Sequence, residues 1–192
     1  MKRISLPAVL KRKLRGDVKR RRARERFVRS NDGATVVEFA LVAAPFFALL
    51  IALFQTALVF FAGRVLDETV EQASREILTG QAQSSGMTQS QFATWVCSNT
   101  YALFNCNNFM INIQNYSSFA SASTTTPTLT FDSHGNVSNS WAYNTGAAGD
   151  IVVVQVMYQW PVVLGPLGFN LSNLSNGNRL LVSTAVFKNE PY

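Results

Sequence analysis

Gly33 and Glu38, five positions apart, are the most informative candidate site in the sequence. Glu38 is a carboxylate near the start of a long apolar run, where a charge costs a few kcal/mol and needs a partner. Gly33 has no side chain, so an extended backbone at this point fits a narrow peptidase site. Cleavage before Ala34 would create an α-amine, on this chain or on a neighbouring subunit, that pairs with Glu38. The alternative is a carboxylate at the membrane edge that reaches into the headgroups.

Two cysteines, Cys97 and Cys106, form the second candidate site. Both follow the apolar run, which places them in the exported compartment if the N-terminus is cytoplasmic. An oxidising compartment favours a disulfide between them, and two buried thiols are the alternative. The chain has no CxxC pair and a single histidine, so we expect no metal site and no cofactor.

Catalytic side chains are not grouped in any recognisable pattern. His134 lies in a Ser-His-Gly-Asn sequence that predicts a solvated turn, and no Ser/His/Asp order, paired-acid motif or glycine-rich phosphate loop accompanies it. We therefore expect a protein that is not an enzyme.

The positive charge of the chain is confined to its beginning. Residues 1–33 hold 13 Lys/Arg and 3 acids, whereas residues 34–192 hold 4 Lys/Arg and 8 acids. Excess Lys/Arg directly before an apolar segment keeps that end cytoplasmic, so we interpret residues 1–33 as a basic cytoplasmic leader. A nucleic-acid-binding tail is the other reading of such charge, and we expect no nucleic-acid partner.

A single membrane-spanning helix is expected at residues 34–63. Gln55 and Thr56 are the only polar residues from Phe39 to Ala62, and about 20 apolar residues suffice to cross a bilayer. Pro45 would kink this helix without ending it. Residues 64–80 extend it with one apolar stripe at helical spacing, and Gly80 suits the position after its end.

Residues 81–192 are expected to form an exported α+β domain. After a polar linker at 81–86, Thr88 and Gln91 predict a capping box for a helix from Gln89 to about Phe104. Alternating apolar residues then predict four strands, at 109–116, 128–132, 151–160 and 179–188. We expect the long N-terminal helix to cover one face of this small antiparallel sheet.

The leader, Gly33, Glu38 and the apolar helix together resemble the processing site of type IV pilin-like proteins. Within that group the chain resembles the TadE-like family of tight-adherence (Tad, or Flp) pilus assembly. The resemblance lies in residues 33–45 (GATVVEFALVAAP), 73–75, 78–80 and 187–192. The motif positions that we single out are Phe39, Pro45, Arg75 and Gly80.

The resemblance implies a pilin-like fold and a role in pilus assembly. A prepilin peptidase would cut between Gly33 and Ala34, leaving residues 34–192 in the bacterial inner membrane as a single-pass minor pseudopilin with a periplasmic domain. Its partners would be membrane lipid, the peptidase, other pseudopilins and the major pilin, whose assembly it would help to initiate or prime. The alternative is an unprocessed single-pass anchor that presents a small binding domain.

Overall fold

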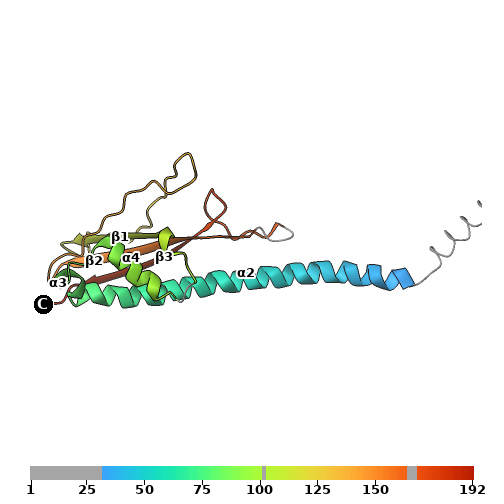
Figure 1. The fold of residues 1–192 in the computed structure, drawn as a ribbon, viewed down its shortest axis with the longest axis horizontal. Helices are drawn as coiled ribbons and strands as arrows, with labels where there is room; N and C mark the ends of the chain where they lie inside the picture. Colours follow the sequence, from blue (N-terminus) through green and yellow to red (C-terminus); the bar gives the residue numbers. More distant parts are fainter. Residues whose placement is uncertain (1–31, 101–102, 164–167) are drawn as a thin grey trace, which may run out of the picture. The chain divides into compact units, whose positions relative to one another are not determined.

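The computed structural model describes residues 32–100, 103–163 and 168–192. It divides into two compact units, residues 1–49 and residues 50–192, which we describe separately. Most of the predicted leader, and parts of the predicted 89–104 helix and of the loop after residue 163, lie outside the described residues. The elements of the chain are labelled in Figure 1.

The long helix α2 (Asp32–Leu78) contributes residues to both units. It begins two residues before the predicted start at residue 34. Pro45 lies inside the helix without ending it, as predicted. In the first unit, the large apolar side chains of residues 36–49 are exposed. Among the described residues, α2 over Gly33–Leu78 is the one helix long and apolar enough to cross a membrane.

In the second unit, α2 changes from an exposed apolar surface to an amphipathic helix. The predicted stripe is buried against the domain; its buried members are Val65, Leu66, Thr69, Val70, Ala73 and Ile77. Glu71 and Arg75 pair across one turn on the exposed face at 3.4 Å. The helix ends before Gly80, which has a φ of 76°, the left-handed conformation that a residue after a helix C-terminus often adopts.

Two short helices follow. The predicted linker contains one turn of helix, α3 (Gln81–Ser84), before α4 (Gln89–Ser98). Thr88 and Gln91 form the predicted capping box at the start of α4. The prediction that this helix reaches Phe104 is wrong, because α4 ends at Ser98. The Asn99 amide donates to Trp95 O and the Thr100 hydroxyl to Cys97 O, so side chains occupy the carbonyls of the last turn.

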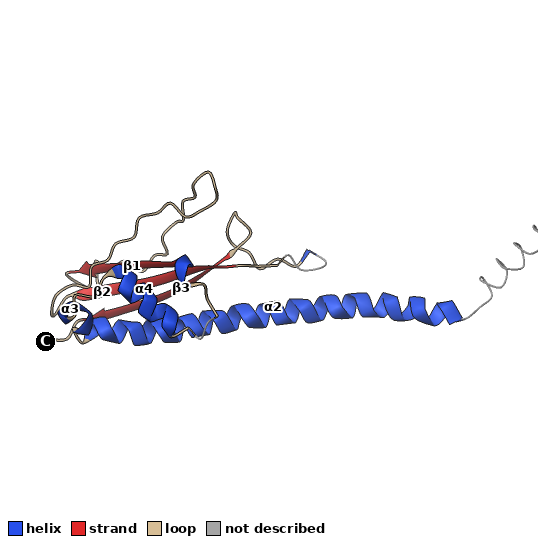
Figure 2. Cartoon of the chain, in the orientation of Figure 1, coloured by secondary structure: helices blue, strands red, loops and turns tan. Residues whose placement is uncertain are grey.

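The sheet has three antiparallel strands in the order β1 (Phe109–Tyr116), β2 (Ile151–Trp160) and β3 (Arg179–Lys188), with the 3₁₀ turn η1 (Cys106–Asn108) directly before β1. Figure 2 shows the sheet beside the helices of this unit. The strand bounds match the predicted ones, and the α+β class is confirmed.

The prediction of a strand at 128–132 is wrong. This segment is irregular and keeps a single bridge, Phe131 to Val137. The Asn139 side chain accepts from Thr130 N at 2.7 Å and donates to Thr128 O at 3.0 Å, so a side chain takes backbone groups that a ladder would need.

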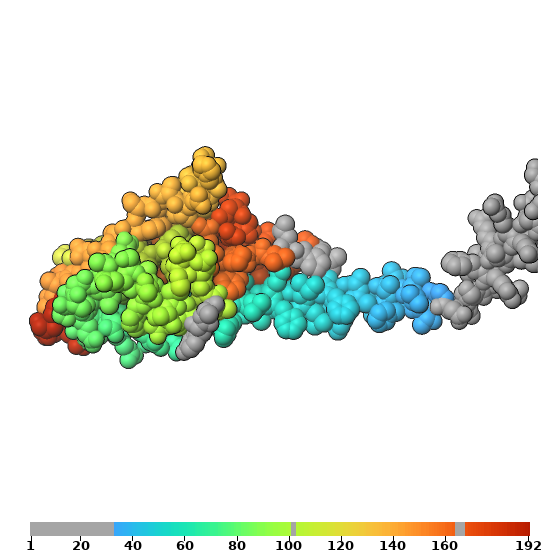
Figure 3. All heavy atoms as spheres, viewed as in Figure 1, coloured from blue at the N-terminus to red at the C-terminus, as the bar shows by residue number. Residues whose placement is uncertain are grey.

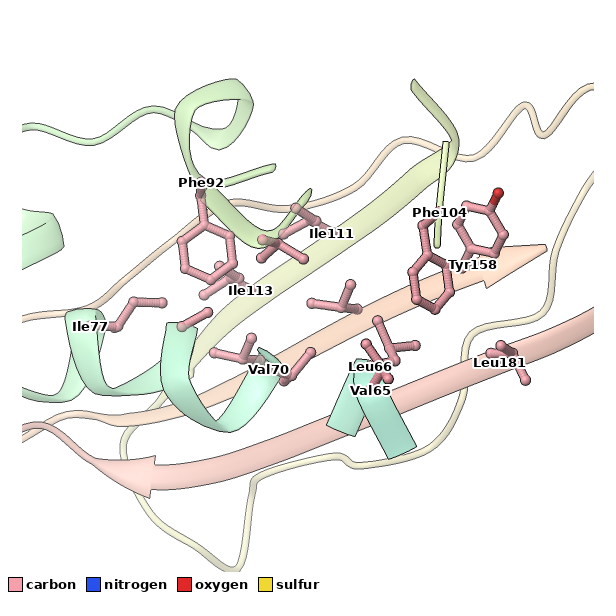
Figure 4. Close-up of a cluster of buried hydrophobic side chains, with 14 of the residues drawn as sticks. Val65, Leu66, Val70, Ile77, Phe92, Phe104, Ile111, Ile113, Tyr158 and Leu181 are labelled. Atoms are coloured by element: carbon pink, nitrogen blue, oxygen red, sulfur yellow. The ribbon is translucent and has the colours of Figure 1, made fainter. Parts of the chain in front are cut away.

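The core lies between the sheet and α2, with α4 packed at its side (Figure 4). Alternate β2 residues, Val152, Val154 and Val156, face this core. The other β2 positions up to Tyr158 are buried as well, because the segment after β1 covers the opposite face, whereas Gln159 and Trp160 are half-buried. Figure 3 shows this segment, coloured gold, as a ridge on the domain. Gln155, buried on that face, donates to Thr125 O and accepts from Asn112. Burial on both faces explains why β2 is a nearly continuous apolar run.

Candidate functional site

The predicted cleavage residues lie in the first turn of α2. Gly33 and Ala34 are both exposed, and no described atom lies within 4 Å of a Cβ built on Gly33. Glycine weakens a helix by about 1 kcal/mol relative to alanine, so helix stability gives no reason for it here. Gly63 is equally open in the same helix, so open space alone does not distinguish Gly33; its position directly before the apolar run does.

Glu38 lies one helical turn after Ala34, on the same side of α2. Residues four apart are surface neighbours on a helix, and each side chain leans toward the N-terminal turn. A carboxylate at Glu38 thus points back toward residue 34. Glu38 is exposed and forms no hydrogen bond or ion pair with any described residue. This arrangement can accept a cation from the same helix start or from a neighbouring chain.

The apolar surface around this charge is continuous. Phe39 is 72% exposed, and Pro45 with its aromatic neighbours Phe46 and Phe47 is exposed one to two turns later. Soluble proteins bury large side chains of this kind, so a helix surface of this composition belongs in hydrocarbon or against other apolar helices.

Arg75 and Gly80, the other two motif positions, lie at the C-terminal end of α2. Both the backbone N–H and the hydroxyl of Thr79 donate to Arg75 O. Gly80 lies against the ring of Tyr192, the last residue, and a Cβ on Gly80 would overlap that ring. Glu190 N donates to Leu78 O at 2.9 Å, so the C-terminal segment satisfies a carbonyl that the helix end leaves unpaired.

A carbonyl of the loop before β2 joins these parts. Thr145 O accepts from Gln83 in α3 and from Asn189 after β3, each at 2.9 Å. Asn189 is 2% exposed and also donates to Ala147 O, while Gln83 donates to Ile77 O. The end of α2, this loop and the C-terminal tail are therefore held as one hydrogen-bonded cluster.

Cys97 and Cys106 form a disulfide with Cα atoms 5.4 Å apart. The bridge ties the last turn of α4 to η1 and hence to the start of β1. The buried Phe104, between the two cysteines, packs on Tyr158 of β2 with ring centroids 4.8 Å apart. The loop that the disulfide closes therefore contains Phe104, and the contact of Phe104 with Tyr158 anchors this loop on the sheet.

Two carboxylates, those of the exposed Asp132 and the partly exposed Asp150, have a lowered pKa. Hydrogen bonds from Ala147 N–H and the Asn115 amide lower the pKa of Asp150. The backbone N–H of Asn136, assisted by that of His134, lowers the pKa of Asp132. His134 is exposed in that turn, where Asp132 accepts its backbone N–H. Burial raises the pKa of the Tyr143 hydroxyl. Among the described residues, no three His, Cys, Asp or Glu side chains could hold a metal ion.

Sequence reasoning missed the residues that bind the helix end to the domain, namely Gln83, Thr145, Asn189 and Tyr192. The signal for Asn189 and Tyr192 was the C-terminal segment 187–192, noted only for its resemblance. Nothing in the local pattern distinguishes Gln83 or the Thr145 carbonyl, because their partners lie 44 to 62 residues away.

Part of the chain matches the model of a known protein family. The family model described as TadE-like protein matches residues 33–75, from the candidate cleavage glycine to the arginine in the last turn of α2. No curated protein and no solved structure matches the chain.

Proposed function

From its TadE-like segment at residues 33–75, we propose that this chain is a minor pseudopilin of a Tad (Flp) pilus system. A prepilin peptidase cuts between Gly33 and Ala34 on the cytoplasmic face of the inner membrane. The product, residues 34–192, remains anchored by the first part of α2 with its α+β domain in the periplasm. There it helps to initiate or prime assembly of the major pilin together with other pseudopilins.

The observation that carries the proposal is that three boundaries of the chain lie together within residues 33–36. The family match starts there, the exposed apolar surface of α2 starts three residues later at Val36, and the charge of the chain changes sign there. A peptidase that removes a basic leader at the membrane surface needs this order of features. An unprocessed single-pass anchor also needs the apolar helix, but it does not need a glycine at the start of that helix.

Glu38 gives the processed form its assembly determinant. Cleavage converts Ala34 to an N-terminal residue one turn from Glu38, and an acid in the first turns of a helix is favoured by the helix dipole. A neighbouring subunit's α-amine serves better still, because a charge pair between chains fixes their axial register within the hydrocarbon. Helices from other pseudopilins or the major pilin would cover the exposed apolar surface around it.

The disulfide supports the periplasmic placement of the domain. Bridges persist in oxidising compartments, and Cys97 and Cys106 both follow the membrane segment. The leader with its excess of Lys/Arg stays on the opposite, cytoplasmic side.

The test is the N-terminus of the full protein recovered from membranes of its host, measured by mass spectrometry. Processing predicts a start at Ala34, and Gly33→Leu predicts accumulation of full-length chain and loss of pili. Gly63→Leu is the matched control, because this second open glycine of α2 lies outside the cleavage site and should leave processing unchanged. A start at Met1 with the peptidase active would reject the proposal.

An unprocessed single-pass anchor is the second candidate function. The observation in its favour is that α2 is already helical from Asp32, so the Gly33–Ala34 bond lies in a helix and would have to unwind to enter a peptidase. This candidate predicts the Met1 start and no effect of Gly33→Leu.

A further inference from the structure

The two edge strands of the sheet differ in whether another segment pairs with their outer side. The outer edge of β1 is occupied by the segment before β2: Ile113 N donates to Ala142 O at 2.8 Å, and Asn144 N donates to Ile113 O at 2.9 Å. β3 is the other edge strand, ten residues long. An exposed edge of that length is a template for pairing, which proteins normally block.

The hydrogen bonds at both ends of β3 identify which residues face outward. Asn189 N donates to Asp150 O, toward β2, so the odd-numbered residues of β3 direct their backbone groups to β2. Leu180 N instead donates to the Asn173 side chain, and Glu190 N to Leu78 O, both away from β2. Between Leu180 and Glu190, four residues of β3 direct their backbone groups away from β2: Val182, Thr184, Val186 and Lys188. We call these the outward-facing residues. Their backbone N–H groups donate to no described residue.

A groove lies directly beside this open stretch. It has a volume of about 210 Å³ and is formed by α2 and β3; its lining includes Ser74, Leu78, Ala185 and Phe187. Ser74 is 5% exposed, and its hydroxyl has no hydrogen-bond partner among the described residues. A strand added to β3 would direct alternate side chains into this groove and bring polar atoms to the Ser74 hydroxyl.

The charges specify the occupant further. Arg179 and Lys188, the first and last residues of β3, are the only Lys/Arg in residues 81–192. Arg179 donates to Leu171 O, whereas Lys188 is exposed and forms no ion pair with a described residue. A carboxylate opposite Lys188 therefore complements the open end of the edge.

Antiparallel pairing with the β3 edge of a second copy does not fit. α2 and β3 run in the same direction, as Figures 1 and 4 show, and the Glu190–Leu78 hydrogen bond joins their ends. Antiparallel β3–β3 pairing would turn the apolar helix segments, residues 50–61, in opposite directions. This step rests on the proposed function, because two chains anchored in one membrane cannot take that arrangement. Pairing of β3 with β1 of another copy is blocked by residues 142–144.

We propose that the outer edge of β3, from Val182 to Lys188, binds an extended segment of another polypeptide by strand addition. The segment spans about seven residues, alternates small apolar side chains that enter the groove beside Ser74, and carries a carboxylate opposite Lys188.

The experiment uses the full chain in detergent micelles and a defined probe, a fluorescein-labelled peptide of alternating threonine and valine ending in glutamate. Two control peptides are used. One carries N-methyl groups at alternate residues, and the other carries lysine in place of the glutamate. Binding is measured by fluorescence anisotropy and located by hydrogen exchange. The expected result is slowed exchange of the outward-facing β3 amides, and at least about tenfold weaker binding of the N-methylated peptide, which cannot complete the ladder.

Two variants test the geometry. Val186→Pro removes an outward-facing N–H and should abolish binding, while Thr126→Pro, in an exposed loop before Pro127, should not change it. Lys188→Glu should weaken binding of the glutamate peptide several-fold and strengthen binding of the lysine peptide. Misfolding of the variant would weaken the binding of both peptides, so it cannot produce this opposite change.

Three outcomes would overturn the proposal: equal binding of the N-methylated peptide, protection elsewhere in the domain, or a β3–β3 dimer of the chain. None of them depends on whether Gly33 is cleaved, so failure here is distinguishable from failure of the proposed function.

Discussion

The aromatic ring of Tyr192 lies directly against Gly80, so the last residue of the chain packs on the residue that terminates its longest helix. Gly80 has a left-handed φ of 76°, and Tyr192 is 56% exposed at the chain end. Two constraints therefore meet at Gly80: a backbone conformation that disfavours a side chain, and a ring in the space that a side chain would fill.

Gly80→Ala should destabilise the domain by more than Gly86→Ala does. Both glycines have positive φ, and alanine there costs about 1–2 kcal/mol. Only at Gly80 must a ring also move, since nothing lies within 4 Å of a Cβ on Gly86. The free energy of unfolding of each variant, from denaturant titration of the full chain in detergent, measures the difference. The excess cost at Gly80 should vanish in a Tyr192→Ala background; an unchanged excess there would show that the ring is not its source.

Loss of the disulfide should lower the free energy of unfolding by about 2–3 kcal/mol, the value expected when a loop of roughly ten residues is no longer closed. The variant is Cys97→Ser, compared with the Cys97→Ser/Cys106→Ser double variant. Both should be equally destabilised and insensitive to reductant, whereas the parent chain should lose the same amount when reduced. Equal stability of reduced and oxidised parent would contradict this expectation.

The lowered pKa of Asp150 predicts acid sensitivity of the loop before β2. Its carboxylate accepts from Ala147 N and Asn115 in the native state, so the native chain binds the proton less readily than the unfolded chain. The resulting stabilisation is complete above the ordinary value of 3.8 and is lost as the pH falls through the lower native pKa.

Hydrogen exchange of the Ala147 amide as a function of pH measures this effect, after correction for the intrinsic exchange rate. Protection should fall below about pH 4 in the parent chain and be low and pH-independent in Asp150→Asn. Asp132→Asn is the control, because Asp132 has a lowered pKa in a different turn and should leave Ala147 unaffected.

Glu38→Gln should leave cleavage and membrane insertion intact and reduce pilus formation by about tenfold or more, as expected for loss of a charge pair in a low-dielectric environment. The matched control is Glu68→Gln, an exposed acid of the same helix outside the apolar segment. Immunoblots of membranes and of sheared pili separate insertion from assembly. Normal piliation in Glu38→Gln would remove the basis for a charge pair at this position.

Elements with local signals could be predicted from the order of residues alone. The uninterrupted apolar run predicts α2, alternation predicts β1 and β3, and the Thr88–Gln91 spacing predicts the cap of α4, because each depends on residues within a few positions of one another. The candidate cleavage site at Gly33, with Glu38 after it, and the Cys97–Cys106 disulfide are likewise predicted from neighbouring residues and from the order of the segments.

Features that depend on distant partners could not be predicted from local patterns. Residues 128–132 alternate like a strand, but Asn139 takes their backbone groups, and Asn99 and Thr100 end α4 early. The Tyr192–Gly80 contact, the shared Thr145 carbonyl and the open outer edge of β3 arise only when segments tens of residues apart are brought together. Periodicity fixes which side chains share a face of an element, but only packing and the competition for each backbone hydrogen bond decide what lies against that face.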